Sequence, residues 1–148
     1  MEKKLIKLSD RSILQVKGRD SEKFLQGIIT CNVEKITNKS SYGSILTPQG
    51  KLLYDFIILK QNNDFLIDIY KSNVDDFIKL LNMYKLRSDV ELIKREDLSV
   101  FVDINDEHSD NENIDPRLAS IGLRKILDSN YEYSSDKKIL YEKKLIKL

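Results

Sequence analysis

The hydrophobic and polar residues of this chain alternate mainly in short runs with a period of two, the spacing typical of β-strands. Two short strands are predicted near the N-terminus, on either side of a polar turn at residues 9–11. Residues 61–64 are predicted to turn between two longer strands and form a hairpin. In its second strand the residues Phe65, Ile67 and Ile69 take alternate positions, so we expect one face of that strand to be buried. The predicted strands cover residues 5–8, 12–17, 42–47, 51–60, 65–70, 90–93 and 98–102.

Two stretches instead have the apolar spacing of an amphipathic helix. The first, about ten residues long, follows Asp20 and Ser21, whose side-chain oxygens are expected to cap it. The second follows Ser72 or Asn73, with acidic residues in its first turn and basic residues near its end, as the helix dipole favours. The apolar faces consist of Phe24, Leu25, Ile28 and Ile29 in the first helix and of Val74, Phe77, Ile78, Leu81 and Tyr84 in the second.

This order of elements, rich in strands with helices inserted between hairpins, favours an α+β fold with an antiparallel or mixed sheet and two main helices. A chain of 148 residues is long enough for one medium-sized domain with its own core. We therefore expect residues 1–148 to form a single domain. Residues 103–115 are acidic and lack periodicity, and they predict an exposed loop. They do not fit a calcium loop, because His108 and Ile114 occupy the positions that require glycine and glutamate.

The composition limits the binding partners and the cellular compartment that we expect for this chain. The net charge of +1 gives no overall attraction to nucleic acid or to an anionic membrane, so we expect neither as a direct partner. Cys31 is the single cysteine, which indicates a reducing compartment. The N-terminus lacks the pattern of a signal peptide, and no apolar run is long enough for a membrane helix. We expect a bacterial-type cytoplasm, with the mitochondrial matrix as the less favoured location.

Few residues offer catalytic chemistry. The single histidine, His108, lies in the acidic segment without a rigid partner, and Cys31 has no histidine near it in the sequence. Glycine-rich phosphate-binding loops are absent from the sequence, and so are cysteine pairs for a metal. Asp55 stands out because it interrupts the apolar strand LLYDFIIL. It either faces solvent on the outer side of the sheet or lies in a cleft that recognises the N–H donors of a ligand such as a pterin ring.

Several motifs carry a family resemblance in the family's order and spacing. They are VKGRD at 16–20, FLQGIITCNV at 24–33, TPQGKLLYDF at 47–56, YKLRSDVEL at 84–92 and DPRLASIGLR at 115–124. They resemble the N-terminal part of the YgfZ-type proteins, members of the folate-binding superfamily that includes the glycine-cleavage T-protein, an aminomethyltransferase.

The resemblance implies the N-terminal part of a pseudo-symmetric folate-binding fold, with tetrahydrofolate as the cofactor. It also implies a role in the maturation or repair of iron–sulfur proteins, with folate and iron–sulfur client or assembly proteins as partners, and a link to tRNA modification. The transferases carry an acidic pair after the glycine turn, where this chain has Tyr54 and Asp55, so the YgfZ side fits better. The candidate folate contacts are Gln49, Gly50, Lys51, Tyr54, Asp55 and Arg87. For Arg87, bonds to helix carbonyls or to an acidic group are expected.

One family signature, K-G-C-Y-x-G-Q-E, does not occur in this sequence. The chain therefore resembles a fragment, one half of a split protein whose missing C-terminal half is a partner, or a degenerate member. Three hypotheses follow. The leading one is a folate-binding accessory factor for iron–sulfur proteins, which need not be an enzyme. The second is an aminomethyltransferase-like enzyme that passes one-carbon units to tetrahydrofolate, and the third is an interaction domain without catalysis.

Overall fold

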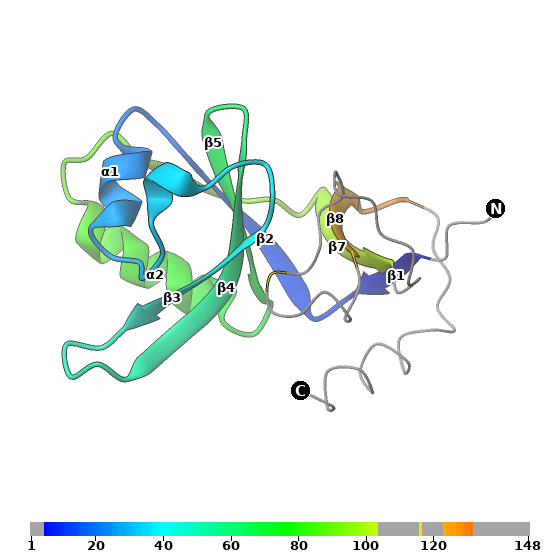
Figure 1. Cartoon of the computed structure of the whole chain (residues 1–148), viewed down its shortest axis with the longest axis horizontal. Helices are drawn as coiled ribbons and strands as arrows, with labels where there is room; N and C mark the ends of the chain where they lie inside the picture. The colour runs from blue at the N-terminus through cyan, green and yellow to red at the C-terminus, as the bar shows by residue number, and fades with distance from the viewer. Residues whose placement is uncertain (1–4, 104–115, 117–122, 132–148) are drawn as a thin grey trace.

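The structure is a computed structural model that describes residues 5–103, 116 and 123–131 (Figure 1). Within these residues the chain forms eight strands, two α-helices and one 3-10 helix. The strands are β1 (Leu5–Leu8), β2 (Arg11–Lys17), β3 (Ser41–Leu46), β4 (Leu52–Gln61), β5 (Asp64–Tyr70), β6 (Glu91–Lys94), β7 (Leu98–Asp103) and β8 (Leu123–Asp128). The helices are α1 (Ser21–Gln26), η1 (Val33–Lys35) and α2 (Val74–Lys85).

The strands form two sheets, and every strand pair among the described residues is antiparallel. The larger sheet has five strands in the order β3-β4-β5-β2-β6, and the smaller has three in the order β1-β7-β8. Strands β1 and β2 follow each other in the chain but belong to different sheets, so the turn at Ser9 and Asp10 links the two. The predicted α+β class is confirmed, with an antiparallel arrangement.

The main core lies between the five-stranded sheet and the helices. Figure 1 shows α1 and α2 on the side of this sheet away from β1, β7 and β8. The alternating positions of the strands that face the helices are apolar and buried, because a strand places every second side chain on the same face. This cluster includes Leu14, Val16, Phe56, Ile58, Phe65, Ile67 and Ile69 from the sheet, Phe24 and Leu25 from α1, and Val74, Phe77 and Leu81 from α2.

A second apolar cluster covers the opposite face of the sheet. Ile13, Leu59 and Leu66 of the large sheet pack there against residues of β1 and β7, which are Ile6, Leu8, Val100 and Val102. The face of residues 65–70 that was expected to be buried, with Phe65, Ile67 and Ile69, is buried, and the opposite face is covered as well. Strand β5 is central in its sheet and lies between the helices on one side and the small sheet on the other.

An ion network crosses between the sheets at the edge of this second cluster. Asp68, in the middle of β5, is 3% exposed, and its carboxylate accepts hydrogen bonds from two guanidinium groups. Nε of Arg11 in β2 lies 2.6 Å from Asp68 Oδ1, and Nη2 of Arg124 in β8 lies 2.6 Å from Asp68 Oδ2. Because buried charges are stable only when paired and hydrogen-bonded, this network fixes how β8 sits over β5.

The N-terminal half of the first predicted helix is confirmed, and the rest differs. Helix α1 ends at Gln26, although Ile29 beyond it is still buried in the core. Asp20 is the N-cap residue of α1 but makes no side-chain cap bond, because its Oδ2 instead accepts from the backbone N–H of Asp89 at 2.8 Å. Asn73, the N-cap residue of α2, makes no side-chain cap bond either.

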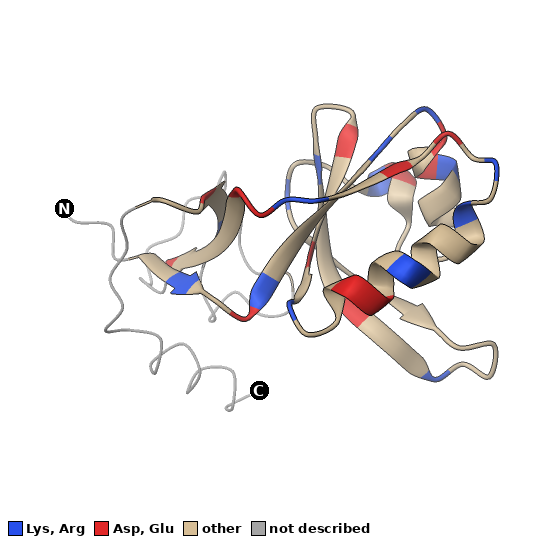
Figure 2. Cartoon of the chain, turned by 180° about the vertical axis from the view of Figure 1, so that it is seen from behind, with Lys and Arg blue, Asp and Glu red and all other residues tan. Residues whose placement is uncertain are grey.

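Two elements were not expected from the sequence, the short helix η1 and strand β8. The predicted loop at 103–115, including His108, lies outside the described residues except for Asp103, which ends β7. Lys and Arg are interspersed with Asp and Glu over both sheets and the helices in Figure 2, in keeping with the net charge of +1. Among the described helices, none has the length and apolarity to span a membrane.

Candidate functional site

The β3–β4 hairpin carries five of the six predicted contact residues. Its turn is held by backbone bonds from Thr47 N–H to the Lys51 carbonyl (2.7 Å) and from Gly50 N–H to the Thr47 carbonyl (2.9 Å). Gly50 has a φ of 83°, a conformation that side chains rarely adopt. Gln49, Gly50 and Lys51 are all exposed at this turn. Lys51 precedes Asp55 by four residues, which corresponds to about 13 Å along an extended strand. A single small group cannot touch both side chains.

Asp55 lies on β4 with its side chain half-buried. The hydroxyl of Tyr42 on β3 donates to Asp55 Oδ2 at 2.9 Å, across the diagonal of the hairpin. Among the described residues, no side chain or backbone group is recorded as a donor to Asp55 Oδ1. By alternation Asp55 shares a face with Leu53 and Ile57, as the sequence predicts, and this is the face that carries Leu59 toward the small sheet.

Two exposed side chains with apolar surface, those of Tyr42 and Leu53, lie on the same face of the hairpin as this carboxylate. Tyr42 is 44% exposed and Leu53 is 43% exposed. Figure 1 shows that this end of the hairpin extends away from the small sheet. A carboxylate oxygen beside apolar side chains suits a flat ring that has N–H donors on one edge, because the ring can cover the apolar groups while its edge bonds to the carboxylate.

Tyr54 and Arg87 do not join Asp55. The ring of Tyr54 packs edge-on against Phe77 of α2, with centroids 5.6 Å apart, so Tyr54 faces the helix side of the sheet. Arg87 is exposed beyond the end of α2, and among the described residues it has no recorded hydrogen bond or ion pair. The expected contact of Arg87 with helix carbonyls or an acidic group is therefore not observed in this part of the chain. Lys85 makes the nearby bond instead, from Nζ to the Val90 carbonyl at 3.1 Å.

Tyr42 is the site residue that the sequence analysis missed. The signal for it is the hairpin register, in which Ser44 pairs with Asp55 and Tyr42 pairs with Ile57. Residues two apart on a strand share a face, so Tyr42 must lie diagonal to Asp55 once the turn at 47–50 is fixed. Among the described residues no group of three or more His, Cys, Asp or Glu side chains is placed to hold a metal ion.

Cys31 packs against the same hairpin and is half-buried. A methyl group placed on Gly43 would lie 3.1 Å from Cys31 Sγ and 2.8 Å from the Phe56 ring, so the thiol packs directly against the β3 backbone. Burial raises the pKa of the Cys31 thiol above its usual value. The arrangement matches a packed thiol rather than an activated nucleophile.

Alkylation of Cys31 is accordingly expected to be slow in the folded protein. The thiolate is the reactive form, so a raised pKa lowers the reactive fraction near neutral pH. The rate with iodoacetamide should increase at higher pH than for the urea-unfolded chain, in which the thiol has its ordinary pKa. Because the folded-state pKa is raised, the thiol's contribution to stability is present below the unfolded pKa and is lost as the pH rises through the folded pKa. Equal rate profiles for folded and unfolded protein would contradict this assignment.

Comparison with solved structures shows which known fold this chain resembles. The structure is similar to the crystal structure of the glycine cleavage system aminomethyltransferase T from Bartonella henselae, with a TM-score of 0.60 and 17% sequence identity. The match covers 66% of this chain and 27% of that protein. The described part of the chain therefore has the fold of an aminomethyltransferase segment, which confirms the expected fold. No protein-family model matches the chain.

Sequence comparison gives closer relatives. The chain is 31% identical over 150 aligned residues to the iron–sulfur cluster assembly factor IBA57 homolog, mitochondrial, of Mycosarcoma maydis, covering 85% of this chain and 36% of that protein. It is 33% identical to the protein of the same name from Neurospora crassa, covering 69% of this chain and 26% of that protein. The resemblance inferred from the motifs is confirmed: the chain is related to the IBA57-type iron–sulfur cluster assembly factors and spans about a third of their length or less.

The expected location is corrected by the same comparison. The relatives from Mycosarcoma maydis, Neurospora crassa and Dictyostelium discoideum are all named as mitochondrial proteins. They point to mitochondria, whereas the sequence analysis favoured a bacterial cytoplasm. The single cysteine could not separate these compartments, because both keep thiols reduced.

Proposed function

We propose that this chain acts as a folate-binding accessory factor in the assembly or repair of iron–sulfur proteins. The sequence similarity to IBA57-type assembly factors is the observation that carries the proposal. Its partners on this proposal are tetrahydrofolate and iron–sulfur assembly or client proteins. A part in tRNA modification would then be indirect, through an iron–sulfur enzyme. The aminomethyltransferase hypothesis draws support only from the fold, and a fold is shared by proteins of different activity.

Asp55 is the proposed contact for the pterin ring. Tyr42 occupies one carboxylate oxygen and holds the side chain in place, which leaves Oδ1 for a donor of the ligand. A pterin offers a ring N–H and an amino group on one edge, and a carboxylate can accept from both. Leu53 and Tyr42 would lie beside the ring, and Lys51 at the exposed turn would meet a more distant, anionic part of the ligand.

Asp55→Asn is expected to weaken tetrahydrofolate binding by about 30-fold to 100-fold, measured by isothermal titration calorimetry under anaerobic conditions. The amide is close to the carboxylate in size and still accepts from Tyr42, so the fold should be retained. It loses the charge and presents a donor to the pterin donors. Equal affinity of the variant and the wild type would remove Asp55 from the site.

Glu91→Gln is the matched control. Glu91 is an exposed carboxylate on β6, at the far edge of the same sheet, and its only recorded side-chain contact in the described structure is Lys17 at 3.7 Å. The substitution removes the same charge without touching the hairpin, so folate affinity should stay at the wild-type value. A parallel loss in both variants would indicate a general charge effect.

The iron–sulfur part of the proposal needs a separate measurement. In cells depleted of their own IBA57 homologue, expression of this chain is expected to raise the activity of mitochondrial iron–sulfur enzymes. The Asp55→Asn variant should raise it less if folate binding contributes to the role. Failure of a well-expressed, folded chain to change these activities would contradict a role in iron–sulfur assembly while leaving the calorimetric result intact.

A further inference from the structure

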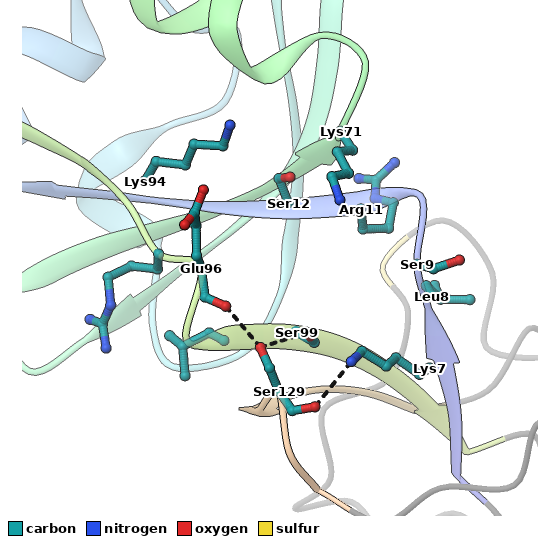
Figure 3. Close-up of a pocket in the computed structure, with 12 residues that line it drawn as sticks. Lys7, Leu8, Ser9, Arg11, Ser12, Lys71, Lys94, Glu96, Ser99 and Ser129 are labelled. Atoms are coloured by element: carbon teal, nitrogen blue, oxygen red, sulfur yellow. Dashed lines mark hydrogen bonds between the residues drawn. The ribbon is translucent and has the colours of Figure 1, made fainter.

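A basic cavity lies at the junction of the two sheets, apart from the β3–β4 hairpin. Its volume is about 350 Å³, and it is lined by the end of β1, the start of β2, the segment that leads from β6 into β7, and the residues after β5 and β8 (Figure 3). None of the six predicted folate contacts lines it. The lining residues are Lys7, Leu8, Ser9, Arg11, Ser12, Lys71, Lys94, Arg95, Glu96, Leu98, Ser99 and Ser129.

Positive charge dominates the lining, with five cationic side chains and a single carboxylate, that of Glu96. Three of the cations are also paired with carboxylates that do not line the cavity. Arg11 meets Asp68 at 2.6 Å, Lys94 meets Asp75 at 3.1 Å and Arg95 meets Asp97 at 2.7 Å. Lys71 has no carboxylate recorded opposite it in the described structure.

The walls of the cavity are fixed by internal bonds. Lys7 Nζ donates to the Ser129 carbonyl at 3.0 Å, and Ser129 Oγ donates to the Glu96 carbonyl at 3.0 Å. Arg11 is held between Asp68 and the Tyr70 ring, with its guanidinium carbon 4.4 Å from the ring centroid. Because these side chains are already held in place, less conformational entropy is lost when a ligand binds.

Two donors at the cavity lack a partner within the described structure. The Lys71 N–H is bonded to the Asp10 carbonyl at 2.7 Å, which anchors this residue beside the β1–β2 turn, but its ammonium group has no recorded bond to any described residue. The hydroxyl of Ser12, half-buried on β2, has none either. Figure 3 shows Lys71, Arg11 and Ser12 close together along one side of the cavity.

We propose that this cavity binds the phosphate group of a small molecule. A phosphate carries a charge of about −1.5 to −2 and three acceptor oxygens, which matches an ammonium group and a hydroxyl group as donors within a positive field. The cavity volume of about 350 Å³ exceeds that of the ion itself and lies at the lower end of small-ligand sites, so the remainder of a small phosphorylated molecule fits beside Leu8 and Leu98. The inference does not depend on folate binding or on the iron–sulfur role.

The binding of inorganic phosphate and of glycerol phosphate to the full chain is measured by calorimetry and by amide chemical shifts, both at constant ionic strength. Lys71→Ala is expected to weaken phosphate binding about tenfold, because it removes a charge-assisted contact. Glu96→Gln should strengthen it about threefold, because it removes the one carboxylate of the lining. Lys79→Ala is the matched control, since Lys79 is an exposed lysine on α2 outside the cavity.

The opposite effects expected for Lys71→Ala and Glu96→Gln distinguish a specific phosphate site from general attraction of anions. Shift changes confined to the cavity residues, with weaker binding in Lys71→Ala and tighter binding in Glu96→Gln, would support the proposal. Tighter binding of glycerol phosphate than of inorganic phosphate would assign the site to a phosphate ester, and the reverse would assign it to the free ion. Absence of phosphate binding to the wild type, equal loss in Lys79→Ala, or equal binding of citrate would each overturn it.

Discussion

Replacing Asp68 by alanine is expected to lower the free energy of unfolding by about 3–5 kcal/mol, the largest effect of any substitution considered for this protein. The side chain of Asp68 is 4% exposed, and those of Arg11 and Arg124 are 7% and 3% exposed. In the variant both guanidinium groups stay buried but lose the carboxylate that balances their charge. A buried charge that loses its partner is costly because water cannot replace the lost bonds.

Urea denaturation followed by circular dichroism measures this loss as a shift of the midpoint at an unchanged slope. Asp75→Ala is the control, because its ion pair with Lys94 is exposed, with 74% of the Asp75 side chain accessible, and should contribute about 0–1 kcal/mol. Asp68→Asn keeps the size and one acceptor oxygen, so its loss should lie between the two. If Asp68→Ala and Asp75→Ala shift the midpoint equally, the buried network does not stabilise the contact between the sheets.

Gly18→Ala is expected to destabilise the protein by about 3 kcal/mol or more. Gly18 has a φ of 122°, a conformation that side chains rarely adopt. An added Cβ would also collide with the Asp89 carbonyl oxygen and lie 2.9 Å from its carbon. That carbonyl accepts the Asp20 N–H at 3.1 Å, while Asp20 Oδ2 accepts the Asp89 N–H at 2.8 Å. Asp89 cannot move away without breaking this pair of bonds.

Gly50→Ala is the control that measures the conformational cost of a side chain at positive φ without a steric collision. Gly50 also has a positive φ, of 83°, but an added Cβ there meets no atom within 4 Å. Only the conformational cost remains, about 1 kcal/mol. Thermal unfolding of the two variants side by side should therefore show a clearly lower midpoint for Gly18→Ala. Similar midpoints would mean that the segment around Asp89 adapts, and that the close approach at Gly18 is not a constraint on the fold.

The sequence predicted the elements whose side chains follow a simple period. Helix α2 and the β4–β5 hairpin were found because their apolar residues repeat at helical or strand spacing. Strand β8 was missed because its inward positions include Arg124, whose burial depends on a carboxylate more than fifty positions earlier in the chain. Periodicity records only local spacing, so a buried cation is read as a surface residue.

The candidate site was predicted less completely than the fold. Asp55 stood out because apolar neighbours surround it, but Asp68 has a similar setting in FLIDIY and is a structural residue. What separates them is the layer above each strand, and only the tertiary structure shows that the small sheet covers Asp68 while the end of the hairpin stays exposed. Tyr54 was grouped with Asp55 as a neighbour in sequence, although adjacent strand residues face opposite sides.

The pairing of β1 sets an order for folding. Among the described strands, β1 pairs with β7 alone, in a register that joins Leu5 to Asp103, so nearly a hundred residues separate the two strands in the chain. During synthesis, β1 leaves the ribosome long before its partner and has an unpaired edge throughout that time. Contacts so distant in sequence form slowly. The β2–β5 and β4–β5 pairs close shorter loops, so the layer of helices and large sheet is expected to form first, with the small sheet closing over it last.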